Sequence, residues 1–491
     1  MAKRLKVLIV SSEVAPFAKT GGLADVAGAL PLALKSSGCN IKVFTPFYRE
    51  TKNGNFNIEI LEKNIKAELI GSNLVFSLYK CRKKGVDFYF VEGEKFFDRD
   101  FLYGTPSGDY PDNAIRFAFF ANAVLSSAIK INFKPDIIHC NDWQTALIPF
   151  YLKYKLKNLR FFANTKTLFT VHNLAYQGLF ARETMPKVGV DYEFFTMHAL
   201  EFYGNFSFIK SGLLYSDAIS TVSNGYAREI LTKERGCGLE GLLSLRKNDI
   251  YGIVNGVDYS EWNPASDKFI KTNYDKKSLK NKRICKQDLL AQMKLSAPEN
   301  APLLGIISRL AHQKGIDIIA DSMKDIVKMG CYLVILGRGD EKYQKLLFTL
   351  SKKYSKNLAV RIAFDNPLAH KIEAGCDMFL MPSRYEPCGL NQMYSLKYGT
   401  IPVVMATGGL DDTVIDYTQE PKNGNGFKFK EANRAGFLQT LKRAVFVYKN
   451  KKTWQKLMLR AMEFDFSWKH SAKEYIKLYN KINPHTRHGK G

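Results

Sequence analysis

The sequence predicts an α/β protein made of two successive doubly wound domains, and three observations lead to this fold class. Two regions repeat a short apolar strand, a glycine-containing loop and about a dozen residues with helical periodicity, which is typical of a parallel sheet covered by helices. Both regions contain the run Thr-Gly-Gly-Leu-X-Asp, at 20–25 and at 407–412. The length of 491 residues also exceeds that of one compact core.

In the first region, apolar runs predict strands at 5–10, 41–45, 136–140, 167–171 and 218–222. Residues of roughly 52 to 110 alternate polar and apolar side chains more often, so we expect them to form an antiparallel insertion at the edge of the sheet. This first domain is predicted to span 1–258.

In the second region, strands are predicted at 303–307, 332–336, 359–362, 378–381 and 402–404, within a domain spanning 301–453. The polar, lysine-rich residues 259–300 are predicted to be a linker zone. An amphipathic helix is expected over 454–484 and a disordered tail over 485–491. Because doubly wound sheets bind ligands beyond the carboxyl ends of their strands, we expect the two domains to face each other across a cleft that holds the active site.

Composition excludes several classes of protein. Hydrophobic residues make up 46% and charged residues 24%, as in a soluble folded chain, and no apolar run approaches the ~20 residues that span a bilayer. The eight cysteines lack the spacing of a metal or redox motif, and no export signal is evident, so a cytosolic protein with reduced thiols is expected. The net charge of +25 raises the possibility of nucleic-acid binding, but the lysines are dispersed. We therefore predict a solvated basic surface, with neither nucleic acid nor membrane as partner.

The run 19–26 follows the first strand and opens the first helix. Its backbone amides, the helix dipole and the charge of Lys19 together favour an anion such as phosphate. The alternative is a tight turn that needs Gly21 and Gly22 for backbone reasons only. The glycine spacing matches neither the dinucleotide fingerprint nor the phosphate loop of ATPases.

Two segments of the second region follow predicted strands in the same way. In 308–315, Arg309 and Lys314 are spaced to hold a diphosphate, whereas the alternative is two exposed cations that oppose the helix dipole. In 382–390, Glu386 stands at the tip of a loop between a strand and a helix. A role in ligand binding is favoured over simple helix capping, because a cap does not need the neighbouring proline, cysteine and glycine.

Polar residues also end two strands of the first domain, in the runs 139–143 and 170–173. A lone histidine is more often structural than catalytic. Two polar strand ends at the same edge of a parallel sheet favour a functional role for His172 and Asp142.

These segments resemble bacterial glycogen synthases and plant starch synthases, which are GT-B glycosyltransferases. The resemblance implies two facing Rossmann-like domains, ADP-glucose as donor, the non-reducing end of glycogen or another α-1,4-glucan as acceptor, and retention of the anomeric configuration. It also implies that no metal or other cofactor is needed. Segments similar to the family, in its order, lie at 19–31, 116–125, 139–147, 169–178, 251–264, 305–315, 333–343, 375–404 and 465–475.

Motif matches to the family imply roles for individual residues. Glu386 would hold the transferred glucose, His172 would face the reacting sugar, and Asp142 is a candidate acceptor-side or proton-handling carboxylate. Together with Lys19, these are the predicted catalytic residues. Phe364 would stack on adenine. The predicted nucleotide-sugar-binding residues are Lys19, Gly21, Gly22, Asp25, Asn173, Arg309, Lys314, Phe364, Cys388, Gly389, Leu390, Thr407 and Gly408.

The sequence departs from the family beside the aspartate, where Asn141 and Gln144 replace the usual histidines. Three alternatives remain open at this point: a related GT-B enzyme that uses UDP-glucose, one that uses a small acceptor, and an inactive glucan-binding scaffold. The sequence does not indicate an oligomeric state.

Overall fold

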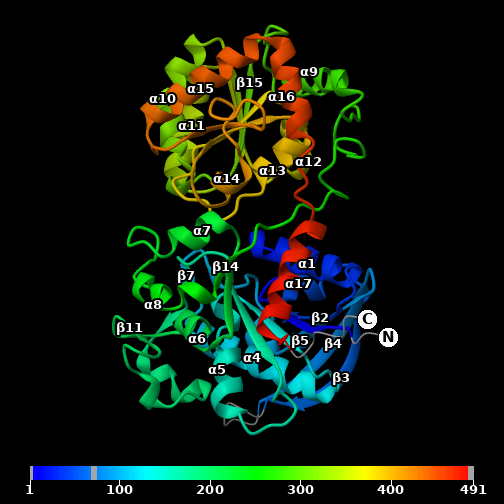
Figure 1. Cartoon of the computed structure of the whole chain (residues 1–491), viewed down its shortest axis with the longest axis vertical. Coiled ribbons are helices and arrows are strands. Elements are labelled where there is room, and N and C mark those ends of the chain that lie inside the picture. The colour runs from blue at the N-terminus through cyan, green and yellow to red at the C-terminus, as the bar shows by residue number, and fades with distance from the viewer. Residues whose placement is uncertain (1–3, 68–73, 485–491) are drawn as a thin grey trace. The chain divides into compact units, whose positions relative to one another are not determined.

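A computed structural model of the chain describes residues 4–67 and 74–484 (Figure 1). These residues form two compact units. Unit 1 contains the described residues of Met1–Val222, Ala227–Gly256 and Trp468–Gly491. Unit 2 contains Ser223–Tyr226 and Val257–Ser467.

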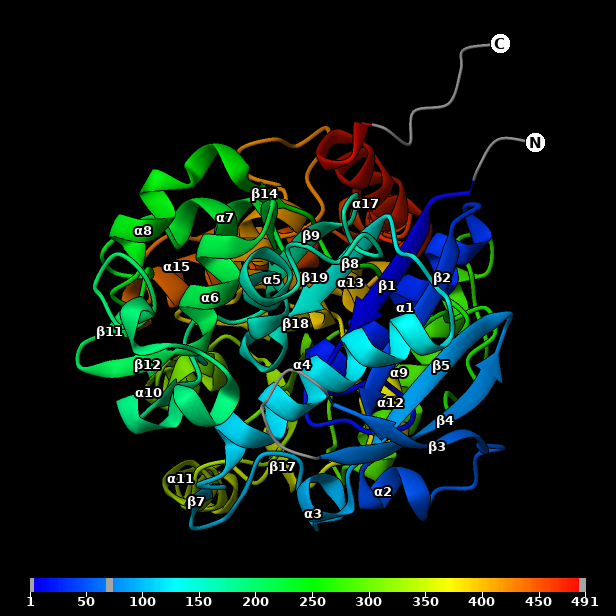
Figure 2. The same cartoon turned by 90° about the horizontal axis from the view of Figure 1, so that it is seen from below.

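Unit 1 is built on a nine-stranded sheet in the order β14-β13-β9-β8-β1-β2-β5-β4-β3. From β14 to β5 neighbouring strands are parallel, whereas β4 is antiparallel to both β5 and β3 (Figure 2). The predicted strands are present, and the antiparallel strands β3 and β4, which fall within the predicted insertion at 52–110, lie at one edge of the sheet. The strands are β1 (Lys6–Val10), β2 (Asn40–Pro46), β3 (Glu59–Lys66), β4 (Val75–Lys83), β5 (Val86–Glu92), β8 (Ile137–Asn141), β9 (Lys166–Val171), β13 (Ala218–Thr221) and β14 (Ile250–Gly252).

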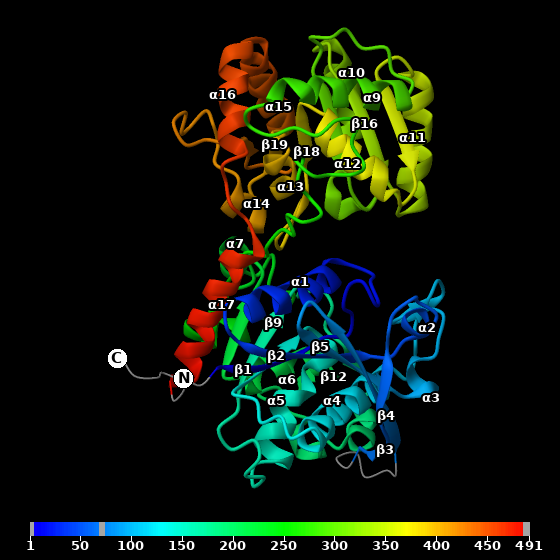
Figure 3. The same cartoon turned by 90° about the vertical axis from the view of Figure 1, so that its right-hand side faces the viewer.

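Helices cover both faces of this sheet, which explains why its central strands are continuous apolar runs. Figure 3 shows α1 (Gly22–Ser36) and α17 (Trp468–Ile482) side by side on one face, with α4 (Asn113–Lys130), α5 (Leu147–Phe150) and α6 (Phe208–Tyr215) on the other. The remaining short elements are α2 (Arg49–Lys52), α3 (Glu94–Phe97), α7 (Asn224–Glu229), α8 (Glu240–Leu245), β6 (Gly104–Thr105), β7 (Gly108–Asp109), β10 (Leu179–Phe180), β11 (Glu201–Phe202) and β12 (Asn205–Ser207).

Unit 2 contains a six-stranded, fully parallel sheet in the order β17-β16-β15-β18-β19-β20. Its strands are β15 (Leu303–Ile307), β16 (Tyr332–Gly337), β17 (Leu358–Ile362), β18 (Met378–Met381), β19 (Ile401–Met405) and β20 (Phe427–Phe429), and all but β20 were predicted. Its helices are α9 (Lys282–Gln292), α10 (Ile316–Lys328), α11 (Glu341–Lys353), α12 (Asn366–Gly375), α13 (Asn391–Lys397), α14 (Gly408–Thr413), α15 (Arg434–Lys449) and α16 (Lys451–Ala461).

The strand order of each sheet has one switch point, at which the strands that come later in the chain lie on the opposite side of the first strand. This switch lies between β1 and β8 in unit 1 and between β15 and β18 in unit 2. The loops that leave these strands diverge, so the carboxyl ends of the strands form the usual ligand site of a doubly wound sheet. The loops containing Lys19, Asp142, Arg309 and Glu386 follow β1, β8, β15 and β18 respectively.

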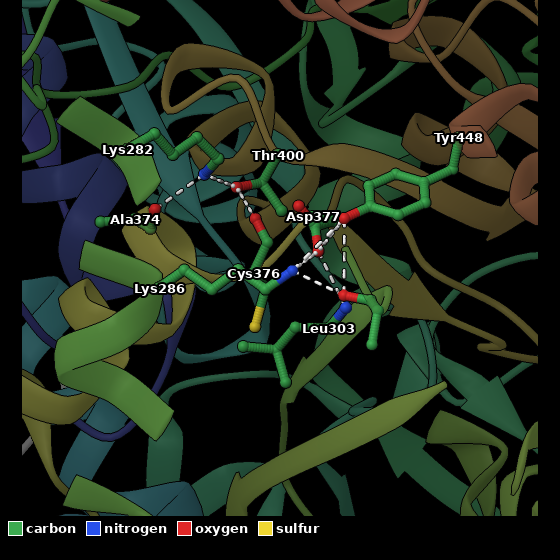
Figure 4. Close-up of polar contacts among 9 residues, drawn as sticks. Lys282, Lys286, Leu303, Ala374, Cys376, Asp377, Thr400 and Tyr448 are labelled. Carbon is green, nitrogen blue, oxygen red and sulfur yellow. Dashed lines mark hydrogen bonds and ion pairs between the residues drawn. The ribbon is translucent and has the colours of Figure 1, made fainter. Parts of the chain in front are cut away.

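Residues 259–300, predicted to be a linker zone, are folded into unit 2. Their helix α9 packs against α12, and its lysines are buried. Lys286 Nζ lies 2.7 Å from Asp377 Oδ2, and Lys282 Nζ donates to the carbonyl of Ala374 at 2.8 Å (Figure 4). Asp377 also accepts the amide of Leu303 at the start of β15. A lysine-rich composition therefore does not distinguish a solvated linker from a segment whose ammonium groups are paired in the interior.

The helix predicted over 454–484 is two helices. Trp454 and Leu457 of α16 belong to the core of unit 2, whereas α17 packs beside α1 in unit 1. Between them, Asp465 Oδ1 accepts the amide of Ser467 at 2.8 Å, a local turn that interrupts the helical pattern. The predicted tail at 485–491 lies outside the described residues.

Two further features bear on the compositional predictions. Within the described part of the chain, no helix has both the length and the hydropathy needed to cross a bilayer. All eight cysteines lie in the described part of the chain as thiols that form no disulfide, and six are buried: Cys39, Cys140, Cys285, Cys331, Cys376 and Cys388.

Candidate active site

The turn between β1 and α1 carries the predicted anion site of unit 1. Lys19 Nζ lies 2.6 Å from Asp25 Oδ1 in the first turn of α1, and the two side chains are 46% and 33% exposed. An exposed ion pair contributes little to stability, so Lys19 can exchange its partner for another anion. Cβ atoms built at Gly21 and Gly22 meet no atom within 4 Å. Open space therefore lies beside both glycines.

The amides of this turn are already held by Glu13, a residue that the sequence analysis missed. Glu13 Oε2 accepts the amides of Thr20 at 2.5 Å and of Gly21 at 3.2 Å. Glu13 Oε1 accepts the hydroxyl of Tyr103 at 3.0 Å. The signal that could have found Glu13 is its place just beyond β1, at the carboxyl end of a central strand. The expectation that these amides face a ligand is thus corrected for Thr20 and Gly21, because a side chain of the protein occupies them.

Asp142 follows β8 in a left-handed backbone conformation with φ of 53°. It is buried, and its Oδ1 accepts the amide of His172 at 2.7 Å. Burial raises the pKa of Asp142 to about 7, opposed by the amides of His172 and Asn173 and reinforced by the negative charge of Glu13. A carboxyl with this pKa exists in both protonation states at neutral pH, as proton transfer requires.

His172 lies beside Asp142 at the end of β9. Its Nε2 is 2.9 Å from Asn141 Oδ1, while Asn141 Nδ2 donates to the carbonyl of Val10 at 3.0 Å. Because the Asn141 amide group presents its oxygen to the imidazole, His172 carries its proton on Nε2. Burial lowers the pKa of His172 to about 3, so the ring is neutral at neutral pH. Asn141 thus fixes the tautomer of His172.

Two other polar residues of these strand ends have structural contacts. Asn173 Oδ1 accepts the amide of Ala175 at 3.1 Å, a local turn that holds the loop after β9. His139 is buried, with Nδ1 2.8 Å from the hydroxyl of Tyr479 and Nε2 2.6 Å from that of Thr170. His139 therefore links β8 to β9 and α17.

In unit 2, the predicted cation and carboxylate meet. Lys314 Nζ lies 2.5 Å from Glu386 Oε2, and the hydroxyl of Ser383 donates to the same oxygen at 3.0 Å. The side chain of Lys314 is 20% exposed, and that of Glu386 is 10% exposed. A cation suited to phosphate thus adjoins an acceptor suited to sugar hydroxyls, at the switch point of this sheet.

Arg309 is connected to the same loop through a neutral side chain. Arg309 Nη2 donates to Gln313 Oε1 at 3.1 Å, and Gln313 Nε2 donates to the carbonyl of Tyr385 at 3.1 Å. The loop after β15 and the loop after β18 are therefore held together, which brings Arg309, Lys314 and Glu386 into one group.

The second Thr-Gly-Gly-Leu run packs directly on the Glu386 loop. The amide of Gly409 donates to the carbonyl of Glu386 at 3.1 Å. Gly408 has φ of 45°, and a Cβ there would lie 2.1 Å from the same carbonyl oxygen. Gln392 Nε2 donates to the carbonyls of Cys388 and Gly389. The predicted residues Cys388, Gly389 and Gly408 therefore belong to the frame around Glu386, and Leu390 and Thr407 adjoin them in the chain.

Phe364 stands apart from that group. It follows β17, the edge strand, and β16 and β15 separate β17 from β18. Its side chain is 90% exposed, and the following Asp365 caps α12 by accepting the amide of Leu368 at 3.0 Å. A ring this exposed has a free face on which a planar base can stack.

Curated relatives align with nearly the whole chain. A glycogen synthase of Geotalea daltonii is 47% identical over 479 residues, covering 97% of this chain and 99% of that protein. Glycogen synthase 2 of Geobacter sulfurreducens is 44% identical, covering 99% of this chain and 100% of its own length. The chain belongs to the glycogen synthase family. Family models agree: the starch synthase catalytic domain matches residues 6–245, and glycosyl transferases group 1 matches 291–454.

Solved structures give the same assignment to this glycogen synthase family member. The catalytic domain of starch synthase IV from Arabidopsis thaliana, bound to ADP and acarbose, matches with a TM-score of 0.90 at 32% identity. The match covers 98% of this chain and 100% of that one. A sucrose-phosphate synthase from Thermosynechococcus elongatus shares the fold, with a TM-score of 0.62 at 16% identity. The predicted GT-B fold and glycosyltransferase class are confirmed.

Proposed function

We propose that this chain is a glycogen synthase that transfers glucose from ADP-glucose to the non-reducing end of glycogen or another α-1,4-glucan, with retention of configuration. The observation that carries the proposal is the pairing of Lys314 with Glu386 at the switch point of unit 2. High identity to glycogen synthases supports it, as does the likeness to a starch synthase that was solved with ADP.

The cations act on the leaving group. As the glycosidic bond to the donor breaks, negative charge grows on the departing diphosphate, and Arg309 and Lys314 stabilise it. Lys19, freed from Asp25, is the cation of unit 1 that can bind a donor phosphate. Removal of one such donor costs about 2.7 to 4 kcal/mol of transition-state stabilisation, or roughly a hundred- to a thousand-fold in turnover.

The carboxylate acts on the sugar. Glu386 Oε2 accepts hydrogen bonds from Lys314 and Ser383, which orient its side chain. When Lys314 turns toward the diphosphate, Glu386 can accept glucose hydroxyls and stabilise positive charge on the sugar. We assign Glu386 to sugar binding and catalysis. Retention through a covalent intermediate and retention through attack on the same face both fit this assignment.

His172 acts on the positive charge of the sugar, and Asp142 acts on the proton of the acceptor. The sugar becomes positive in the transition state, and a neutral imidazole does not repel it. The ring or carbonyl of His172 can therefore face the reacting sugar. Asp142, with a pKa of about 7, can take up or release the acceptor proton.

We propose that transfer needs no metal ion, because lysine and arginine meet the diphosphate charge. Among the described residues, no three His, Cys, Asp or Glu side chains are grouped to hold a metal. Chelation is expected to leave the rate unchanged, and a loss of activity that Mg²⁺ restores would contradict this. The interdomain cleft and the cytosolic location stay predictions.

One experiment tests donor, acceptor and catalytic carboxylate together. Incorporation of labelled glucose is measured with ADP-glucose or UDP-glucose, and with glycogen or glucose 6-phosphate as acceptor. We expect transfer from ADP-glucose to glycogen. Transfer from UDP-glucose alone would replace the proposed donor, and transfer to glucose 6-phosphate alone would replace the proposed acceptor. No transfer at all would favour a glucan-binding scaffold.

Glu386→Gln removes the charge and keeps the shape of the side chain. We expect turnover to fall by about a hundred-fold or more. Glu341→Gln is the matched control, because Glu341 pairs with Lys345 on the exposed surface of α11 and lies in no predicted site. Equal activity of the two variants would remove Glu386 from the mechanism.

A further inference from the structure

Glu13 is an unusual carboxylate because neutral groups alone hold it. The side chain is buried, with the residue 4% exposed. Its donors are the amides of Thr20 and Gly21 and the hydroxyls of Thr20 and Tyr103. Within the described chain, no lysine or arginine forms an ion pair with Glu13. Lys19, the cation of the same turn, pairs with Asp25 instead.

These contacts define the shape of the turn. Glu13 lies at the end of β1, so its carboxylate ties the start of α1 to a central strand of the sheet. Gly21 is the N-cap of α1, and Glu13 accepts the amide of this residue, so its carboxylate holds the point at which the helix begins. Lys19 directly precedes Thr20, so the contacts of Glu13 also hold the backbone that carries the Lys19 side chain. The amide of Lys19 itself donates to Glu50 Oε1 at 3.2 Å.

The charge of Glu13 has a second effect, on the end of the neighbouring strand. It is one of the causes that raise the pKa of Asp142, after burial. The other groups that act on Asp142 are the amides of His172 and Asn173, which lower that pKa. Glu13 is thus the charged group that acts on Asp142 from another loop.

We propose that Glu13 is a positioning residue for the transfer reaction: its carboxylate holds the Thr20–Gly21 turn that presents Lys19. This inference rests on the proposed function. The two effects can be separated, because one needs an acceptor oxygen and the other needs a negative charge.

Two substitutions make that separation. In Glu13→Gln, the amide oxygen still accepts from Thr20 and Gly21, while its nitrogen can donate to the hydroxyl oxygen of Tyr103, whose own proton then turns to Ser12 Oγ at 2.8 Å. The shape is kept and the charge is lost. In Glu13→Ala, both the oxygen and the charge are lost, so the turn loses its tie to β1.

The first measurement is hydrogen exchange of peptides covering residues 15–25, which needs no enzyme activity. We expect faster exchange at Thr20 and Gly21 in Glu13→Ala and near-parental exchange in Glu13→Gln. We also expect Glu13→Ala to raise the KM for the donor about ten-fold, as loss of one well-placed hydrogen bond does. Parental exchange and parental KM in Glu13→Ala would overturn the positioning role.

The second measurement is the pH profile of kcat/KM. The limb of this pH profile near pH 7 is first assigned to Asp142, because that limb should be absent from the profile of Asp142→Asn. Removing the negative charge of Glu13 favours the ionised form of Asp142, so the limb should move to lower pH in Glu13→Gln. Glu50→Gln is the matched control, because Glu50 touches the same turn and is not among the causes that shift Asp142.

An unmoved limb in Glu13→Gln would overturn the electrostatic role, as would an equal shift in Glu50→Gln. If Glu13→Ala does not fold, Glu13→Gln still decides the electrostatic role. If the parent protein transfers no glucose, the proposed function fails, and hydrogen exchange still decides whether Glu13 holds the turn.

Discussion

The two Thr-Gly-Gly-Leu runs have the same letters and different physical reasons for their glycines. In unit 1, side chains at Gly21 and Gly22 would meet open space, and the amide of Gly21 donates to the carboxylate of Glu13. In unit 2, a Cβ at Gly409 would lie 2.2 Å from the carbonyl oxygen of Cys388. The first pair of glycines leaves room, and the second pair allows two backbones to touch.

The comparison extends to the lysine that belongs to each group. Lys19 and its partner Asp25 are both well exposed, whereas Lys314 and Glu386 are largely covered. Unit 1 therefore presents a mobile cation on an open turn, and unit 2 holds its cation in a packed frame. A repeated motif thus does not show that two sites work alike.

The largest expected effect separates the glycines. Gly409→Ala forces the backbone of the Glu386 loop to move, so we expect the free energy of unfolding to fall by about 3 kcal/mol, with most transfer activity lost. Gly22→Ala should change stability by less than about 1 kcal/mol, because alanine suits the first turn of a helix. Thermal unfolding and transfer assays measure both. Comparable destabilisation by the two variants would end the contrast.

A smaller effect separates the two lysines. Lys314→Met leaves the Glu386 carboxylate without its cation, and we expect a loss of about 2 kcal/mol in the free energy of unfolding. Lys19→Met should cost less than about 0.5 kcal/mol, because its pair is exposed. Both should lower turnover, which distinguishes a site residue from a stabilising one. Denaturant titration gives the stability values, and a larger loss for Lys19→Met would reverse the assignment.

The effect that is smallest per pH unit concerns the polar strand ends of unit 1. Burial lowers the pKa of His139 to about 3, so between pH 6.5 and 3 the unfolded chain binds a proton that the folded chain does not. The stability that this histidine contributes is present above pH 6.5 and lost as the pH falls. His139→Gln should reduce the slope of unfolding free energy against pH by about 1.4 kcal/mol per unit in the acid range.

Asp142 has the opposite sign. Its raised pKa makes the folded chain hold a proton that the unfolded chain has released, so its contribution is lost as the pH rises from 3.8 to about 7. The His139 variant is therefore compared with the parent at each pH, which cancels the Asp142 contribution. Parallel curves for variant and parent would show that His139 is protonated in the folded chain.

Local patterns were enough to predict most of the fold. The runs at 303–307 and 378–381 match β15 and β18, because a strand buried on both faces must be apolar at every position. The same patterns placed Arg309, Lys314 and Glu386 after strands. Residues 259–300 were harder, because Lys282 and Lys286 look solvated until Asp377 and the Ala374 carbonyl are found beside them.

The amino-acid sequence by itself determined which loops are polar, which strands precede them and to which family the chain belongs. Only the tertiary structure decided how those polar groups are shared: Glu13 occupies the amides of the first turn, Asn141 orients His172, and Lys314 pairs with Glu386 across 72 residues of chain. The physical reason is that strand periodicity is a local property of neighbouring residues. Hydrogen-bond partners are selected by the strand order of the sheet, which brings distant loops to one edge.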